Sequence, residues 1–230
     1  MYKKKKILVV VPARGGSKGI KNKNLKKIGK KSLIEIAANV LKRVNLIDCS
    51  MISTDNLKIA KEAKKFGLKF FKKRAKNLSG HNVGDAPVLK DALNQAEKKM
   101  NMKFDIILMC QVTSPLRKKK DIISCIKLII NKNFNSVWSI SKVDRKFHPL
   151  KQLKLIKNKI HYFSSSGSKI IARQQLNDTY IRNGAIYAFT RKSILKMNLL
   201  PNKSGAIVLK SKQVSIDTKE DLNYVKKLLV

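Results

Sequence analysis

Acidic and aromatic residues are scarce in this sequence, and the two shortages together narrow the partners that it can have. The 230 residues contain 14 Asp and Glu against 52 Lys and Arg, a formal net charge of +38, and only 6% of them are aromatic. A field of this sign attracts polyanions such as nucleotides or nucleic acids. The lysines are, however, spread along the whole chain among Asn and Ile, as an AT-biased coding sequence would produce. A nucleic-acid-binding module concentrates its basic residues and interleaves aromatic side chains for stacking, so we do not expect nucleic acid as the partner.

The chain also lacks paired cysteines and long apolar runs. There is no C-x-x-C pair and no histidine at ligand spacing, so we expect neither a disulfide framework nor a zinc site, but buried, reduced thiols at Cys49, Cys110 and Cys125. No apolar run approaches the roughly 18 residues that a membrane-spanning helix needs. The run at residues 7–11 is shorter than the about 7–15 residues in the core of a secretory signal. These absences predict a cytoplasmic protein without a membrane span.

Short apolar segments alternate with amphipathic ones along most of the sequence. We predict strands at residues 7–11, 51–53, 68–71, 104–110, 136–141 and 183–189, and helices at 32–44, 57–66, 85–99, 120–130 and the C-terminal end. Repeated strand–helix units imply an α/β fold with a mostly parallel sheet and helices on both faces, whose ligands bind at the carboxyl ends of the strands. From 144 to 182 the pattern changes to short extended pieces and the flexible run SSSGS. This change predicts a small lobe inserted into a single domain that spans residues 1–230.

A basic, glycine-rich loop follows the first predicted strand, in the stretch ILVVVPARGGSKGIKNKN at residues 7–24. It is not a dinucleotide fingerprint, because Arg14 occupies the first glycine position of G-x-G-x-x-G, and it does not supply the P-loop pattern G-x-x-x-x-G-K-[ST]. Glycines let backbone amides approach an anion, and neighbouring cations balance its charge. The loop therefore predicts a site for several phosphates at once, such as a triphosphate; a solvated basic loop is the alternative. The residues concerned are Gly15, Gly16 and Gly19 with Arg14, Lys18 and Lys23.

Residue patterns for hydrolytic chemistry are absent. The three histidines, His81, His148 and His161, belong to no triad pattern, and the sequence contains neither G-x-S-x-G nor H-E-x-x-H. We therefore do not expect a hydrolase.

Several short motifs carry a family resemblance over essentially the whole chain. The stretch PARGGSKGIKNKN resembles the nucleotide-binding motif of the acylneuraminate cytidylyltransferases, which are the CMP-sialic acid synthetases and their legionaminic-type relatives. The likeness continues in order through STD at 53–55, RAKNLS from 74, QVTSPLR at 111–117, HPLK at 148–151, RQQ at 173–175, NGAIYAF at 183–189 and IDTKEDL at 216–222. The glycine-rich motif and QVTSPLR are the specific members of this series.

The resemblance implies a Rossmann-like nucleotidyltransferase fold, a homodimer made through the lobe at 144–182, and a defined reaction. That reaction transfers CMP from CTP to the anomeric hydroxyl of a nine-carbon 2-keto sugar acid and releases pyrophosphate, with Mg²⁺ as cofactor. Phosphoryl-type transfer asks a protein mainly for positioning and charge neutralisation, which agrees with a loop of glycine, arginine and lysine.

The family pattern also implies roles for individual residues. Catalytic roles fall on Arg14, Lys23 and Asp217. Nucleotide binding falls on Arg14, Gly15, Gly16, Ser17, Lys18, Lys23, Asn24 and Arg74. Sugar binding falls on Gln111, Thr113, Arg173 and Asn183, of which Arg173 is a cation suited to the carboxylate of the sugar acid.

Two motifs depart from the family pattern. The chain reads SIDT where relatives often read DIDT, so Ser215 replaces one of two acidic residues and leaves Asp217 as the metal ligand. Magnesium can be held by one carboxylate together with phosphate oxygens and water, so a single Asp217 can suffice. The alternative for Asp217 is a place at the start of the last helix, which Glu220 or Asp221 could also cap. The second departure, Cys110 and Val112 around Gln111, indicates only a change in packing.

Three other functions are kept as alternatives. A synthetase for CMP-activated 3-deoxy-manno-octulosonic acid shares the implied fold, although a different, acidic motif would be expected in place of QVTSPLR. The high positive charge is compatible with an RNA-binding protein, and the missing acid at 215 with a nucleotide-binding protein without catalysis. The motifs do not distinguish among N-acetylneuraminate, legionaminate, pseudaminate and close analogues.

Overall fold

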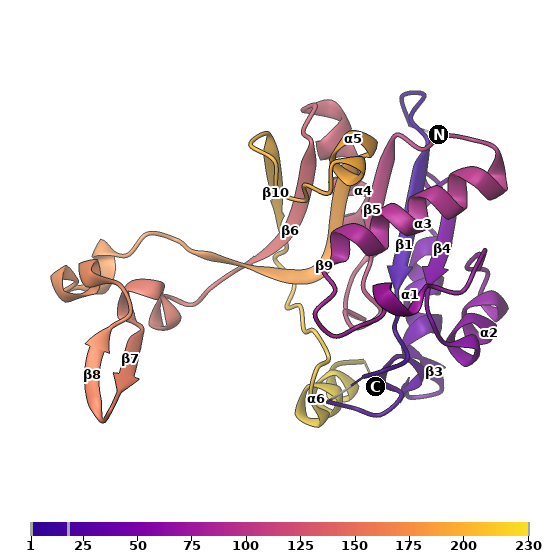
Figure 1. The fold of residues 1–230 in the computed structure, drawn as a ribbon. Coiled ribbons are helices and arrows are strands. Elements are labelled where there is room, and N and C mark those ends of the chain that lie inside the picture. Colours follow the sequence, from indigo (N-terminus) through magenta and orange to yellow (C-terminus); the bar gives the residue numbers. More distant parts are fainter. Residues whose placement is uncertain (1, 18, 230) are drawn as a thin grey trace.

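The computed structural model describes residues 2–17 and 19–229, and its centre is a six-stranded sheet. The strands lie in the order β10-β6-β9-β5-β1-β4, and every neighbouring pair is parallel except the two that involve β9. Their bounds are β1 Ile7–Pro12, β4 Cys49–Ser53, β5 Ile106–Met109, β6 Ser136–Lys142, β9 Tyr180–Thr190 and β10 Ser204–Val208. The predicted mostly parallel sheet is confirmed (Figure 1).

Helices cover both faces of this sheet because its inner strands are apolar on both sides. Ile7, Val9 and Val11 belong to a core cluster with residues of α1, α2, α4 and α6, whereas Leu8 and Val10 belong to a second cluster with residues of α3 and α5. The helix bounds are α1 Leu33–Lys42, α2 Leu57–Lys65, α3 Asp85–Met100, α4 Lys119–Asn131, α5 Arg191–Leu195 and α6 Lys219–Leu229.

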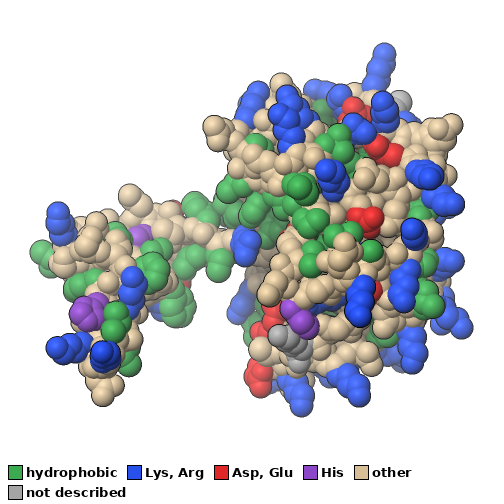
Figure 2. All heavy atoms as spheres, in the orientation of Figure 1, with side chains coloured by type: hydrophobic (Ala, Val, Ile, Leu, Met, Phe, Trp, Pro, Cys, Tyr) green, Lys and Arg blue, Asp and Glu red, His purple; other side chains and the backbone are tan. Residues whose placement is uncertain are grey.

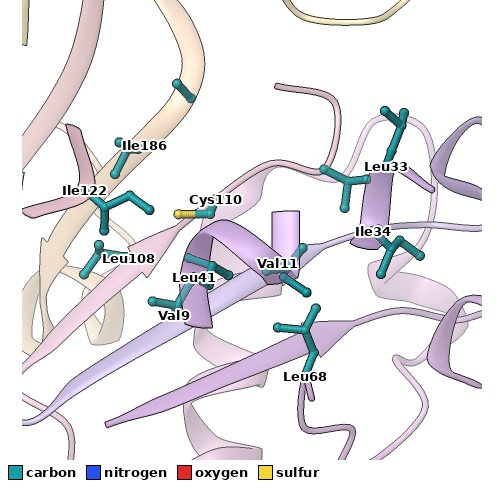
Figure 3. Packing of buried hydrophobic residues seen from close by; sticks show 14 of the residues in the cluster. Val9, Val11, Leu33, Ile34, Leu41, Leu68, Leu108, Cys110, Ile122 and Ile186 are labelled. Carbon is teal, nitrogen blue, oxygen red and sulfur yellow. The ribbon is translucent and has the colours of Figure 1, made fainter. Parts of the chain in front are cut away.

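The first cluster shows how strand and helix residues interlock. Figure 3 places Val9 and Val11 of β1 beside Leu41 of α1, with Leu108 and Ile186 from the neighbouring strands. Each of these side chains is at most 2% exposed. Burial of one such aliphatic side chain is worth roughly 1.5–3 kcal/mol, so this packing holds the carboxyl ends of β1 and β5 at fixed positions.

The helix starts follow from capping residues in the sequence. The Ser32 hydroxyl accepts a hydrogen bond from the Glu35 amide (3.1 Å) at the start of α1, and the Asn56 side chain accepts from the Lys58 amide (2.9 Å) at the start of α2. Each bond satisfies an amide that has no partner within its helix. Both helices therefore begin within a residue of the predicted positions.

The predicted strand at 68–71 is wrong. Lys69 alone pairs with β4, through hydrogen bonds with Ser50 and Ile52 (both 2.9 Å), and the contact is a single bridge next to Met51. The chain then turns toward Arg74, whose amide donates to the Thr54 carbonyl (2.8 Å). Only Leu68 of this stretch is buried, so little apolar area holds a longer strand in place.

A lobe lies between β6 and β9, away from the sheet (Figure 1). It contains the hairpin β7 Leu153–Ile156 and β8 Lys159–Tyr162 and four short 3-10 turns at Arg145–Phe147, Pro149–Lys151, Ser165–Lys169 and Arg173–Gln175. Large apolar side chains on the lobe are exposed, among them Leu155 at 72% and Ile160 at 69%. Figure 2 shows hydrophobic side chains gathered on the lobe and on the segment that joins it to the sheet, whereas Lys and Arg are scattered over the body.

The three cysteines are buried and unpaired, as the sequence predicts. Burial raises the pKa of the Cys49 thiol to about 11, so this thiol stays protonated near neutral pH. None of the helices in the described part of the chain has the length and apolar character needed to cross a bilayer.

Candidate functional site

A cavity of about 550 Å³ lies at the carboxyl ends of β1 and β5. Four segments that are far apart in the sequence meet there: the glycine-rich loop, residues 74–88, the QVT stretch after β5 and the segment before α6. Their contributions include Arg14, Ser17, Gly19, Lys23 and Asn24, then Arg74, His81 and Asp85, then Gln111, Val112 and Thr113, then Ser215 and Asp217. Five of the eight nucleotide-binding residues predicted from the sequence, Arg14, Ser17, Lys23, Asn24 and Arg74, therefore line one cavity, whereas Gly15 and Gly16 belong to the same loop but do not line it.

Side-chain and backbone bonds fold the glycine-rich loop around this cavity. The Gly15 amide donates to the Asp55 carboxylate (2.8 Å), and the Asn24 amide group donates to the Arg14 carbonyl (2.9 Å). The Arg14 guanidinium in turn donates to the Gly80 carbonyl (3.1 Å), which joins the loop to the opposite wall. The Gly15 amide is therefore already bonded, which leaves the side chains of the loop and its other amides as the groups that could meet an anion.

Gly19 allows the loop to pass directly against the segment before α6. A Cβ atom at this position would overlap the carbonyl oxygen of Asp217, and backbone cannot move aside as a flexible side chain can. Glycine therefore brings the loop and Asp217 together, a close approach that no other residue type permits. Lys18 lies outside the described residues.

Lys23 and Asp217 form an ion pair inside the cavity. The Lys23 Nζ lies 2.8 Å from the Asp217 Oδ1; the lysine side chain is 16% exposed and that of the aspartate 67%. Lys23 belongs to a 3-10 turn, Lys23–Leu25, at the end of the loop. The pair joins two residues predicted to be catalytic, which are 194 positions apart.

Asp217 does not cap the last helix. The Asp221 carboxylate accepts hydrogen bonds from the Asp217 and Thr218 amides (3.0 and 2.8 Å), and the Thr218 hydroxyl accepts from the Asp221 amide (3.1 Å). These backbone bonds lower the pKa of the Asp221 carboxyl. Capping by Asp221 and Thr218 leaves the Asp217 carboxylate available within the cavity.

The described residues include no group of three or more His, Cys, Asp or Glu side chains that could hold a metal ion. Ser215, which stands where relatives often have a second acid, donates to the Thr113 hydroxyl at 3.5 Å. The Ser215 hydroxyl therefore already has a hydrogen-bond partner. A divalent cation bound at Asp217 would take further ligands from phosphate oxygens and water, and Asp85 is the other carboxylate that lines the same cavity.

A buried arginine and an acidic residue form the wall opposite the loop. The Arg74 side chain is 5% exposed and donates to the Ser79 hydroxyl (3.3 Å), and burial lowers the pKa of its guanidinium. Asp85 is the first residue of α3 and faces the cavity. Removal of water by the surrounding atoms raises the pKa of its carboxyl, and the charges of Arg182 and Arg74 oppose that shift.

A second cavity of about 460 Å³ adjoins the first, and Asp85, Gln111, Ser215 and Asp217 line both. The other residues that line it are mostly neutral hydrogen-bonding groups: Ser141, Asn183, Tyr187 and Gln213, with Ile181, Arg182 and Gly184. The first cavity is therefore lined by three cations, Arg14, Lys23 and Arg74, and two carboxylates, whereas the second is suited to a polar, hydroxyl-rich molecule.

Hydrogen bonds hold the residues of this second cavity in place. The side-chain oxygen of Asn183, Oδ1, accepts a hydrogen bond from the Ser139 hydroxyl (2.6 Å), and its side-chain nitrogen, Nδ2, donates to the Ser141 hydroxyl (3.0 Å). The buried Arg117 donates to the Gln111 and Ala185 carbonyls (3.1 and 2.6 Å). Arg117 thus fixes the backbone of the QVTSPLR and NGAIYAF motifs to each other without lining either cavity.

The predicted sugar-binding residues do not all come together. Gln111 and Asn183 line the second cavity and Thr113 the first, whereas Arg173 belongs to a turn of the lobe and lines neither. The Arg173 side chain is 71% exposed and lies 3.8 Å from Asp144.

Sequence reasoning also missed residues of the site: Asp85, Arg182, Tyr187 and His81. Tyr187 lies within the NGAIYAF motif, which was a signal that could have identified it, whereas Asp85, Arg182 and His81 belong to no such motif and only the fold places them at the cavities.

Comparisons with known proteins agree with this geometry. The chain is 30% identical to "Post-translational flagellin modification protein B" of Campylobacter coli over 222 residues, which are 95% of this chain and 92% of the relative. It is 29% identical to "CMP-N,N'-diacetyllegionaminic acid synthase" of Campylobacter jejuni, over 95% of this chain and 92% of that protein. The solved structure of a CMP:2-keto-3-deoxy-manno-octonic acid synthetase complexed with CTP has the same fold, with a TM-score of 0.72, 18% identity and coverage of 97% and 98% of the two chains.

The resemblance seen in the sequence motifs is confirmed by these relatives. The family described as Cytidylyltransferase matches residues 8–228, which include both cavities, the lobe and nearly all of α6. This chain belongs to the cytidylyltransferase family.

Proposed function

We propose that this protein transfers CMP from CTP to the anomeric hydroxyl of a nonulosonic acid, a nine-carbon 2-keto sugar acid, and releases pyrophosphate. The observation that carries the proposal is the junction of the two cavities at Asp217. One cavity offers Arg14, Lys23 and Arg74 to a triphosphate, and the other offers neutral polar groups to a sugar. Relatives named as synthases of CMP-linked legionaminic acid and as pseudaminic acid cytidylyltransferases support the same reaction class.

The nucleotide half supplies charge and position. Arg14 and Lys23 hold phosphate oxygens, and the buried Arg74 adds a third cation whose place is set by its bond to Ser79. Gly15, Gly16, Ser17 and Asn24 shape the loop, Asn24 through its bond to the Arg14 carbonyl. Nucleotide binding by Lys18 is proposed from its place in the sequence motif alone. Groups of this kind stabilise the charge that develops as the sugar hydroxyl approaches the α-phosphorus and pyrophosphate leaves.

The donor set at Asp217 fits Mg²⁺. Its carboxylate is exposed at the junction of the cavities and is not used to cap α6. Mg²⁺, when bound, neutralises phosphate oxygens of CTP. The ion pair with Lys23 holds the Asp217 carboxylate in the cavity that the proposal assigns to the triphosphate.

In this proposal the sugar half uses Gln111 and Asn183 of the second cavity and Thr113 of the adjoining first cavity, and Arg173 reaches the sugar from a second copy of the chain. Arg173 lines neither cavity of its own protomer, and the lobe that carries it exposes a large apolar surface. A homodimer in which the lobes pack together would bury that surface. CTP and free sugar acids are metabolites of the cytoplasm, where we place the enzyme.

Pyrophosphate release from CTP and Mg²⁺ tests the proposed function. The acids to supply are N-acetylneuraminate, N,N'-diacetyllegionaminate, pseudaminate and, as the competing class, 2-keto-3-deoxy-manno-octonate. We expect release with one or more of the nine-carbon acids and none with the eight-carbon acid. Release with the eight-carbon acid alone would show that the protein is a synthetase for that acid and not for a nonulosonic acid. Salt-sensitive RNA binding without release for any acid would contradict the proposal altogether.

A further inference from the structure

Arg182 stands out among the charged residues of the second cavity. Along the described part of the chain it is the only Lys or Arg that lines this cavity, whereas two carboxylates, Asp85 and Asp217, line it as well. The Arg182 side chain is exposed, and among the described residues its guanidinium takes part in no ion pair or hydrogen bond. An arginine in a polar cavity with its donors unused is positioned to bind an anionic group of a ligand.

The electrostatics of the cavity agree with this position. The charge of Arg182 lowers the pKa of Asp85 and, to a smaller extent than burial raises it, that of the Tyr187 hydroxyl. Arg182 therefore acts on groups from two elements, the start of α3 and β9. Without it, the lining of the second cavity would carry only negative charge.

The proposed reaction sets a strict requirement on where a substrate carboxylate can be, and the inference rests on that proposed function. In a cyclised 2-keto acid, the carboxylate and the attacking hydroxyl are bonded to the same carbon. When the hydroxyl points toward the triphosphate, the carboxylate must lie within a few bond lengths of the same junction. There it meets the charges of the triphosphate, Asp85 and Asp217, and like charges at such short distances repel strongly.

A cation at the junction must offset this repulsion. Arg173 of the same protomer lines neither cavity. Lys23 and Arg74 line the cavity assigned to the nucleotide but not the second one, and Lys23 is paired with Asp217. Arg182 lines the second cavity beside Asn183 and Gly184, and its planar fork matches two carboxylate oxygens.

We propose that Arg182 binds the carboxylate of the sugar acid and is a residue by which the enzyme selects 2-keto acids over neutral sugars. This role belongs to the protomer that also supplies the triphosphate loop, so it does not require a second copy of the chain.

The test compares a sugar acid with its C1 amide, which keeps the shape and removes the charge. For an acid that the wild type accepts, Arg182→Ala should raise the KM for the acid roughly 10- to 100-fold and leave the KM for CTP unchanged, since a charge-assisted bond to a carboxylate is lost. The wild type should have a high KM for the amide, and Arg182→Ala should not raise that KM further. Arg182→Lys should recover part of the loss for the acid, because it restores the charge without the fork.

Arg43→Ala is the matched control, because it removes the same charge from the end of α1, where among residues 2–17 and 19–229 Arg43 donates only to the Asn39 carbonyl. It should change neither constant. The inference would be overturned if Arg182→Ala changed the KM for acid and amide equally, or changed neither. It would also be overturned if Arg173→Ala abolished the preference for the acid over the amide and Arg182→Ala did not. Failure of the proposed function is a separate result: the wild type would release no pyrophosphate with any acid, and the inference would fall with it.

Discussion

Replacement of Gly184 by alanine should weaken use of the sugar acid and leave use of CTP almost intact. Gly184 has a φ of +71°, in the left-handed region, and a Cβ there would lie 2.7 Å from the Gln111 Oε1 and 3.3 Å from the Ser114 Oγ. Both distances are shorter than ordinary contact, so Gln111 has to turn away. Gln111 lines both cavities, and its displacement changes the wall at their junction.

The size of the effect follows from these two costs. A left-handed backbone costs a residue with a Cβ about 1–2 kcal/mol, which in a chain of this length lowers the Tm by about 2–8 °C. Loss of one neutral hydrogen bond from Gln111 to the sugar is worth about 0.5–1.5 kcal/mol, or a rise in KM of roughly 2- to 12-fold. Thermal unfolding measures the first cost, and pyrophosphate release at saturating CTP with varied acid measures the second.

Gly67→Ala separates strain from function. Gly67 also has a positive φ, +81°, and its added Cβ would meet the Lys42 Cε at 2.9 Å, at the mobile end of a surface side chain. We expect the two variants to lose similar stability and only Gly184→Ala to raise the KM for the acid. The same KM in both variants would refute the idea that Gly184 positions Gln111 for the sugar.

Three further changes test other parts of the structure. Arg14→Ala should lower the rate of pyrophosphate release by roughly 10²–10³ with the fold unchanged, because it removes a cation that acts on developing charge. Asp217→Asn should raise the Mg²⁺ concentration for half-maximal release, and Ser215→Asp should lower it if both side chains face one ion. Glu97→Gln should reduce the free energy of unfolding at pH 7 by about 1–3 kcal/mol, because Glu97 accepts two hydrogen bonds from Arg191, both 2.8 Å, and one from the Phe104 amide. The bonds from Arg191 are the main reason that the pKa of Glu97 lies below 4.5, so this stability is present above pH 4.5 and is lost as the pH falls through the lower folded value.

Each of these changes has a control and a result that would contradict it. Arg43→Ala should release pyrophosphate at the wild-type rate. A wild-type rate in Arg14→Ala would contradict the assignment of the glycine-rich loop to the triphosphate. If neither Asp217→Asn nor Ser215→Asp changed the Mg²⁺ concentration for half-maximal release, Asp217 would not be a metal ligand, and the ion would be held by phosphates and water. Glu62→Gln breaks only a surface pair with Lys65, 3.8 Å long, and should change stability little. A difference between wild type and Glu97→Gln that stays constant down to pH 2 would contradict the ionic part of the Glu97 contact.

Local sequence by itself determined the elements that lead to the site. The apolar run of β1 is buried on both faces and ends at a loop of glycines and cations, a pattern that depends only on adjacent residues. The starts of α1 and α2 follow from Ser32 and Asn56, which cap amides one turn away. Interactions of such short range can be read from the order of residues along the chain, so the sheet class and the position of the basic glycine-rich loop were predictable.

The tertiary structure decided which distant charges meet. Lys23 pairs with Asp217 across 194 positions, and the choice of Asp221 rather than Asp217 as a helix cap depends on atomic distances that no spacing predicts. Arg182 and Asp85 belong to no motif, yet antiparallel β9 and the start of α3 bring both to the second cavity. The order and direction of the strands decide which of these residues come together. That order and direction result from the burial of the whole core. Electrostatic contacts act over a few ångströms, so their partners become known only when the chain has folded.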